Sequence, residues 1–89
     1  MALPDEPKFY GKYRGFIADN NDPKGAGRVK VKVPALFGDQ VLAEWAWPCL
    51  PVASTPSPIT TPPPIGAPVW VEFEMGDIDK PIWSGFWGE

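Results

Sequence analysis

Two segments show period-two alternation, which is the pattern of a β-strand with one buried face, and the alternation of apolar and polar residues is strict in the first of them. In residues 28–33 a valine follows a cation three times. Residues 68–74 alternate as well, and their apolar set is Val69, Val71 and Phe73. We therefore predict two half-buried antiparallel strands whose valines lie in the core, while Lys30 and Trp70 point to the other side.

Three more segments combine aromatic and β-branched residues between turn formers, and each predicts a short strand. They are residues 9–20, 44–50 and 81–87. Gly11 and Gly15 predict a bend or a bulge in the first of them. The turn formers of residues 20–27 predict a long hairpin loop that leads into the first alternating strand.

The strand predicted at residues 44–50 has Trp45, Trp47 and Cys49 on one face, which we expect to be the core face. Cys49 is then a buried, unreactive thiol, and as the only cysteine it has no disulfide partner within the chain. Pro48 confines this strand to an edge or a bulge, because proline cannot donate a hydrogen bond to a neighbouring strand.

The last predicted strand is apolar on both sides, with Ile82 and Phe86 opposite Trp83 and Trp87. A small barrel covers only one face of each strand, so some of these aromatic side chains must lie outside it. A cluster of exposed aromatic residues on neighbouring strands normally marks an interface. We therefore predict that Trp70, together with Trp83 or Trp87, contacts a symmetry mate or another protein.

The remaining segments are predicted to be irregular. Residues 1–8 form an N-terminal arm, residues 35–42 a loop, and residues 51–68 a proline-rich loop. The proline runs also fit polyproline II ligands, but a rigid connection stiffened by proline is the favoured interpretation. Five short strands without a convincing helix predict one closed barrel over residues 9–89, because closure removes exposed edges.

The composition agrees with a single small all-β domain. A chain of 89 residues has room for one domain, and 13 prolines with nine glycines favour short strands over long helices. The net charge of −3 argues against a protein that follows phosphates. Neither a signal peptide nor a membrane-spanning apolar stretch is recognisable, so we expect the product to stay in the cytoplasm unless an assembly carries it out.

The residue types also argue against an enzyme and against a metal protein. The chain has no histidine, so Cys49 has no imidazole to activate it. The carboxylates that a glycosidase pair would need are better explained as solvated or turn residues; they are Glu44, Glu72, Glu74, Asp77 and Asp79. Asp19, Asn21 and Asp22 lack the spacing of a calcium loop and are explained by turn chemistry. We expect no catalytic, metal or cofactor site and no small-molecule substrate.

Several segments, in this order, resemble one known family. Gly27-Arg-Val-Lys-Val-Lys-Val-Pro34, preceded by Asp19-Asn-Asn-Asp-Pro23, resembles the first hairpin of the oligonucleotide/oligosaccharide-binding (OB) domain of phage baseplate spike proteins and of type VI secretion spike proteins. Residues 47–51, Trp-Pro-Cys-Leu-Pro, fit the middle of that domain. Residues 66–85 resemble its final hairpin, and together these segments cover most of residues 9–88.

The resemblance implies a five-stranded antiparallel OB barrel that forms a homotrimer under the tail hub of a virion. In that family the barrel leads into a needle, whereas this chain stops at Glu89 directly after the barrel. We therefore expect an adaptor between the hub protein and the needle or spike-tip protein, with the needle either a separate protein or absent. The expected location is the tail baseplate, assembled in the host cytoplasm.

An OB barrel has a second possible role, binding of single-stranded nucleic acid. The second strand offers a row of cations and the third offers two tryptophans; these residues are Arg28, Lys30, Lys32, Trp45 and Trp47. A negative net charge and tryptophans assigned to the core argue against this role. It stays the alternative, because fold alone does not confer function.

Overall fold

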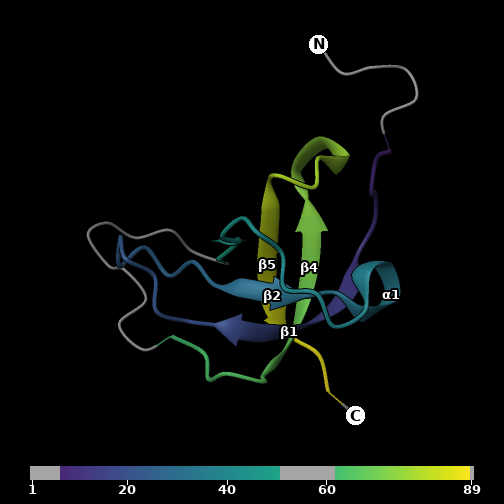
Figure 1. The fold of residues 1–89 in the computed structure, drawn as a ribbon. Coiled ribbons are helices and arrows are strands. Elements are labelled where there is room, and N and C mark those ends of the chain that lie inside the picture. Colours follow the sequence, from purple (N-terminus) through teal and green to yellow (C-terminus); the bar gives the residue numbers. More distant parts are fainter. Residues whose placement is uncertain (1–6, 51–61, 89) are drawn as a thin grey trace.

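Five strands form one sheet in the computed structural model, which describes residues 7–50 and 62–88. The elements are β1 (Tyr13–Asp19), β2 (Lys30–Lys32), α1 (Pro34–Phe37), β3 (Trp47–Pro48), β4 (Pro68–Phe73), the 3-10 turn η1 (Glu74–Gly76) and β5 (Pro81–Phe86). Every predicted strand is present, each shorter than its sequence pattern. In Figure 1, β1 and β2 cross β4 and β5 at a steep angle, so the sheet curls back on itself.

The two outer strands of this sheet are joined by a single bridge. The strand order is β2-β1-β4-β5-β3, and Val29, just before β2, pairs with Ala46, just before β3. Their backbone groups exchange two hydrogen bonds, at 3.1 and 2.7 Å. The bridge connects the edges of a sheet that is curled into a half-barrel, so the closure predicted from the sequence is reached at this bridge and not along whole strands.

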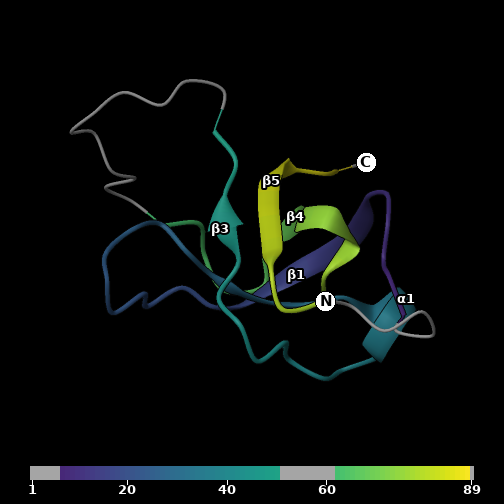
Figure 2. The same ribbon diagram turned by 90° about the horizontal axis from the view of Figure 1, so that it is seen from above.

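The sheet is mixed and not purely antiparallel, which corrects the predicted pairing. β1 pairs antiparallel with β2 and β4, and β4 pairs antiparallel with β5. β3 instead runs parallel to β5, with Trp47 opposite Ile82 and Pro48 opposite Trp83 (Figure 2). A parallel pair needs a long connection between its strands, and the proline-rich segment and the β4–β5 hairpin together supply it.

The valines of both alternating strands lie in the core, as predicted. Val29, Val31 and Val33 are fully buried, and β4 shows the burial pattern of a strand with one covered face. The core also receives residues from the other strands and from the loop before β3; it consists of Ile17, Val29, Val31, Val33, Leu42, Ala46, Val69, Val71, Phe73 and Trp83.

Gly15 lies where β1 passes between β2 and β4. A Cβ atom at this position would lie 2.7 Å from Cγ2 of Val71 and 3.0 Å from the carbonyl oxygen of Lys32, so only glycine fits. The bulge in β1 is elsewhere, because the register with β2 shifts between Ile17 and Asp19. The predicted bend is present at Gly11, which has φ 90°, whereas the irregularity in the pairing lies beyond Gly15.

The short helix α1 is absent from the sequence prediction, which assigned residues 35–42 to a loop. Pro34 occupies the first turn, where its missing N–H costs no hydrogen bond. Gly38 ends the helix with φ 60°, and its N–H donates to the carbonyl of Pro34 at 3.1 Å. Proline and glycine, which usually interrupt helices, are here the start and stop signals of a single helical turn.

Phe9 covers the end of the barrel beside α1. Its N–H donates to the carbonyl of Gly76 at 2.9 Å, and its ring packs at 5.5 Å from Phe37 and 5.9 Å from Phe73. Most of the predicted proline-rich loop, residues 51–61, lies outside the described residues. Its described end is attached to β1, since the N–H of Gly66 donates to the carbonyl of Ile17 at 2.7 Å, and the side chain of Asn20, just after β1, donates to the carbonyl of Pro63 at 2.9 Å.

Candidate functional site

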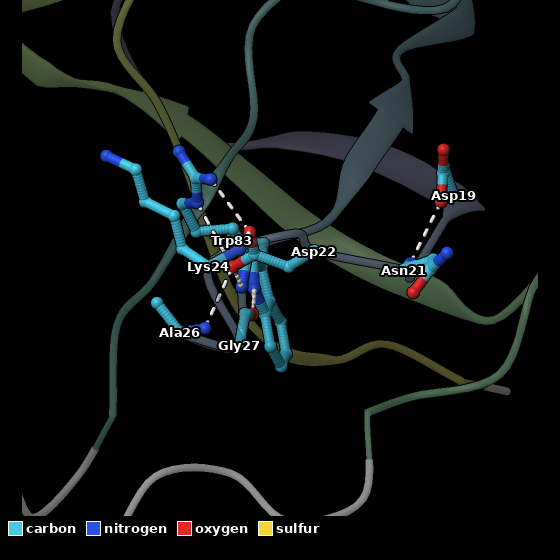
Figure 3. A network of polar contacts seen from close by, with 8 residues as sticks. Asp19, Asn21, Asp22, Lys24, Ala26, Gly27 and Trp83 are labelled. Carbon is cyan, nitrogen blue, oxygen red and sulfur yellow. Dashed lines mark hydrogen bonds and ion pairs between the residues drawn. The ribbon is translucent and has the colours of Figure 1, made fainter.

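The loop between β1 and β2 is organised around the carboxylate of Asp22 (Figure 3). Its two oxygens accept from the backbone N–H groups of Lys24, Ala26 and Arg28, at 2.9 to 3.1 Å. They also accept from the guanidinium of Arg28, at 3.1 Å from Nε and 2.7 Å from Nη2. Asp19 makes a similar local turn by accepting from the N–H of Asn21, which confirms the turn chemistry predicted for this segment.

The pair of Asp22 and Arg28 is held out of solvent, with exposed side-chain fractions of only 4% and 11%. The guanidinium of Arg28 holds the pKa of Asp22 well below its ordinary value, and the backbone donors lower it further against the opposing effect of burial. The same hydrogen bond raises the pKa of Arg28. The charge of Arg28 is thus balanced inside the protein.

Trp45 and Trp47 lie outside the barrel, which corrects the face assigned to this strand. Ala46 is the fully buried residue, because its pairing with Val29 turns its side chain inward. Trp47 is 50% exposed, and Cys49 is exposed as well, so its thiol is not in the core. The small side chain of Ala46 therefore occupies the core position that the sequence pattern assigned to the tryptophans.

The residues proposed for nucleic-acid binding are partly brought together. The guanidinium carbon of Arg28 lies 5.6 Å from the ring centre of Trp45 and 5.1 Å from that of Trp47. Lys30 approaches Trp45 at 5.2 Å. Lys32 is not part of this group and lies 4.0 Å from Asp39. Cations and tryptophans therefore share one surface, as cation–π pairs.

A cleft of about 570 Å³ opens beside Trp47. It lies between β3 and the β4–β5 hairpin, and we name it the Trp47 cleft. Its lining combines tryptophan, proline and isoleucine surface with carboxylates and two basic residues: Arg28, Glu44, Trp45, Trp47, Pro48, Cys49, Glu74, Asp79, Lys80, Pro81 and Ile82. The size is within the range of about 300–1,000 Å³ that ligand sites occupy.

A second aromatic surface covers the outside of β1 and β4. Arg14 lies 5.8 Å from the ring centre of Trp70 and 4.7 Å from that of Trp87, and Phe16 packs edge-on against Trp87 at 5.4 Å. We name Arg14, Phe16, Trp70 and Trp87 the outer aromatic face. Trp70 points away from the core as predicted, because its strand neighbours Val69 and Val71 are fully buried.

Trp83 belongs to the core and not to this surface. It is 6% exposed and lies opposite Val71, and its Nε1 donates to the carbonyl of Gly27 at 3.1 Å. The sequence left Trp83 and Trp87 as alternative companions of Trp70, and of the two only Trp87 packs on the outer face. The pairing register of β4 and β5 decides between them.

Two functional candidates were not identified from the sequence. Arg14 and Phe16 flank Gly15, whose side of β1 is buried, so strand alternation places both on the outer side. Combining that alternation with the outward position of Trp70 is the signal that would have found them. No group of carboxylate and cysteine side chains in residues 7–50 and 62–88 is arranged to hold a metal ion.

The described part of the chain contains no helix long and apolar enough to cross a membrane. Comparison with family models gives a match that is described as the type VI secretion system/phage-baseplate injector OB domain. The match spans residues 13–87 and so includes every strand and both aromatic surfaces. No curated protein matches the chain.

Proposed function

The chain belongs to the family of injector OB domains of type VI secretion systems and phage baseplates, and from this premise we propose that it is a trimeric adaptor linking the tail hub to the central spike. Membership of the family supports a structural role in a baseplate. The finer assignment, an adaptor with two protein neighbours, rests on what the surface of this barrel offers.

The observation that carries the proposal is the outer aromatic face. Trp70 and Trp87 are both half-buried on the outside of a barrel whose core is already filled. Large aromatic side chains and arginine are the residues enriched at the centres of protein interfaces. A closed symmetric assembly would bury this face on every copy and would supplement the thin core of a small domain.

Arg14 fits the centre of such a contact. Its guanidinium carbon lies 4.7 Å from the ring centre of Trp87, and this cation–π contact favours one orientation of the planar guanidinium. A preordered arginine loses little side-chain entropy on binding. We expect the location to be the tail baseplate of a virion or of a related injection machine, and we expect the role to be mechanical, without a cofactor.

The test is the oligomeric state of the purified chain by light scattering, for the native sequence and for Trp70→Ala. We expect a trimer for the native chain and a shift towards monomer for the variant, with an unchanged far-ultraviolet circular dichroism spectrum. Met75→Ala is the control, because Met75 is 80% exposed and lies outside the outer aromatic face. A native chain that is monomeric both alone and with its hub protein would contradict the proposal, as would an assembly that Trp70→Ala leaves intact.

Binding of single-stranded nucleic acid is a second candidate, favoured by one observation. Arg28 lies against exposed Trp47 and Lys30 against half-buried Trp45, which is an arrangement that stacks bases beside cations. The charge of Arg28 is balanced by Asp22, and the adjoining cleft is rich in carboxylates. We therefore expect only weak binding of oligo-dT at physiological salt; submicromolar binding that falls steeply with added salt would favour this candidate.

A further inference from the structure

The Trp47 cleft is a second site of recognition, separate from the outer aromatic face. We propose that it binds an extended, basic segment of a neighbouring protein. The binding itself follows from the chemistry of the cleft. The identification of that neighbour as a tail protein, the second contact of the adaptor, rests on the proposed function.

Charge selects a basic ligand. Three carboxylates line the cleft, those of Glu44, Glu74 and Asp79, and among the described residues none of them belongs to an ion pair. The guanidinium of Arg28 is already neutralised by Asp22 at 2.7 Å. Against the one remaining lining cation, Lys80, the cleft carries an excess of two negative charges. Lysine or arginine side chains of a partner complement this lining.

The apolar part of the cleft favours an extended backbone. Trp47 is 50% exposed although Arg28 lies against its ring, so a large part of its surface is open to a ligand. Pro48 and Ile82 continue this apolar surface on β3 and β5. Grooves lined by tryptophan and proline hold extended, polyproline-like segments, whose stiff backbone loses little entropy on binding. A segment that combines proline or aliphatic stems with basic ends matches both parts of the lining.

The same features disfavour a phosphate backbone. Nucleic-acid binding requires several cations that can replace condensed counterions. Here Arg28 is committed to Asp22 and Lys32 lies beside Asp39, so of the proposed cations Lys30 alone has no ion pair among the described residues. The three carboxylates that line the cleft would repel phosphates at close range. Tryptophan rings can stack on nucleic-acid bases and on proline rings alike. Charge is therefore the property that distinguishes a nucleic acid from a basic peptide as the ligand.

Fluorescence anisotropy of labelled probes tests the proposal. The probes are an arginine–proline repeat peptide, a glutamate–proline repeat of the same length and oligo-dT. We expect the basic repeat to bind, to change the tryptophan emission, and to weaken with added salt, because its charges are near the surface. We expect the acidic repeat and oligo-dT to bind at least roughly tenfold more weakly, a difference of about 1.4 kcal/mol.

Variants locate the contact on the cleft. Trp47→Ala and the double change of Glu74→Gln with Asp79→Asn should each weaken the basic repeat by roughly tenfold, as expected from losing a partly desolvated cation–π or charge contact. Glu72→Gln is the matched control: Glu72 lies two residues before Glu74, pairs with Lys12 at 3.9 Å, and does not line the cleft. Circular dichroism should be the same for all four proteins.

Three results would overturn the proposal: no binding of the basic repeat, equal or tighter binding of oligo-dT, or binding that both cleft variants leave unchanged. These results are separate from a failure of the proposed function. Trp70→Ala, which tests self-association, should bind the basic repeat as the native chain does, because Trp70 does not line the cleft. Loss of the trimer with retained peptide binding, or the reverse, would identify which of the two inferences is wrong.

Discussion

At the scale of single residues, alternation predicts which face of a strand a side chain occupies only where the two faces differ clearly in polarity. In β2 valine and lysine alternate, and the prediction that Val31 is buried and Lys30 is outside is confirmed. In the segment of Trp45 and Trp47 the sequence places the larger apolar side chains on one face, yet small Ala46 is the core residue. Size and hydrophobicity alone do not reveal that the bridge to Val29 fixes the facing.

The buried position of Val31 gives the first prediction. Val31→Asp should unfold the domain or lower its free energy of unfolding by several kcal/mol, a large part of the roughly 5–15 kcal/mol available, because an unpaired carboxyl enters a fully buried site. Lys30→Glu should change it by about 1 kcal/mol or less, since Lys30 loses only its contact with Trp45. Thermal melts that affect the two variants equally would contradict the facing of β2.

Asp22 gives a prediction about pH. Its lowered pKa means that the ionised carboxylate stabilises the native state above its ordinary value of 3.8, and that this contribution is lost as the pH falls below that value. Asp22→Asn should lower the melting temperature at neutral pH, and its difference from the native chain should shrink in acid. Asp39→Asn is the control, because the side chain of Asp39 is fully exposed and its ion pair with Lys32, at 4.0 Å, is a long one. A difference that stays constant with pH would mean that the charge of Asp22 is not responsible.

At the scale of elements, the strands could be predicted and their partners could not. Composition and alternation indicate where β1, β2, β4 and β5 lie to within a few residues. Nothing local indicates that β3 runs parallel to β5, because that pairing joins segments far apart in the chain. The same limit applies to the candidate site, where Trp70 and Trp47 were identified as candidates. The packing of Arg14 on Trp70 depends on the pairing of β1 with β4, and the acidic lining of the Trp47 cleft depends on the pairing of β3 with β5.

Gly15 shows how one element constrains its neighbours, and it gives the third prediction. Gly15→Ala should lower the free energy of unfolding by about 1–3 kcal/mol, because the added methyl group would lie 2.7 Å from Val71 and 3.0 Å from backbone oxygen. Gly88→Ala should be neutral, since no atom lies within 4 Å of a Cβ at that position. Denaturant titrations measure both. Equal stabilities of the two variants would contradict this prediction, because they would mean that the strands make room for the added methyl group without loss of stability.

At the scale of the whole molecule, the barrel carries aromatic residues on two separate surfaces. The outer aromatic face lies on β1, β4 and the residue after β5, and the Trp47 cleft lies between β3 and the β4–β5 hairpin. The proposed adaptor needs a contact with copies of itself as well as contacts with its protein neighbours, and surfaces of different chemistry can serve these different contacts. The acidic lining of the cleft and the largely apolar character of the outer face make the two surfaces chemically distinct, so neither would readily substitute for the other.

Self-association through the outer aromatic face makes stability depend on protein concentration, which gives the last prediction. Because assembly consumes folded chains only, the melting temperature of the native chain should rise with concentration by mass action. Trp87→Ala should abolish this dependence, whatever it does to the midpoint through its lost contact with Phe16. The dependence of the melting temperature on protein concentration therefore distinguishes a role of Trp87 in an interface from a role in local packing alone. Phe86→Ala is the matched control, since Phe86 is the aromatic residue next to Trp87 and is 58% exposed. Phe86 pairs with buried Val69 and is not part of the outer aromatic face. A native melting temperature that is constant over a wide dilution series, or a slope that Trp87→Ala preserves, would contradict assembly through this face.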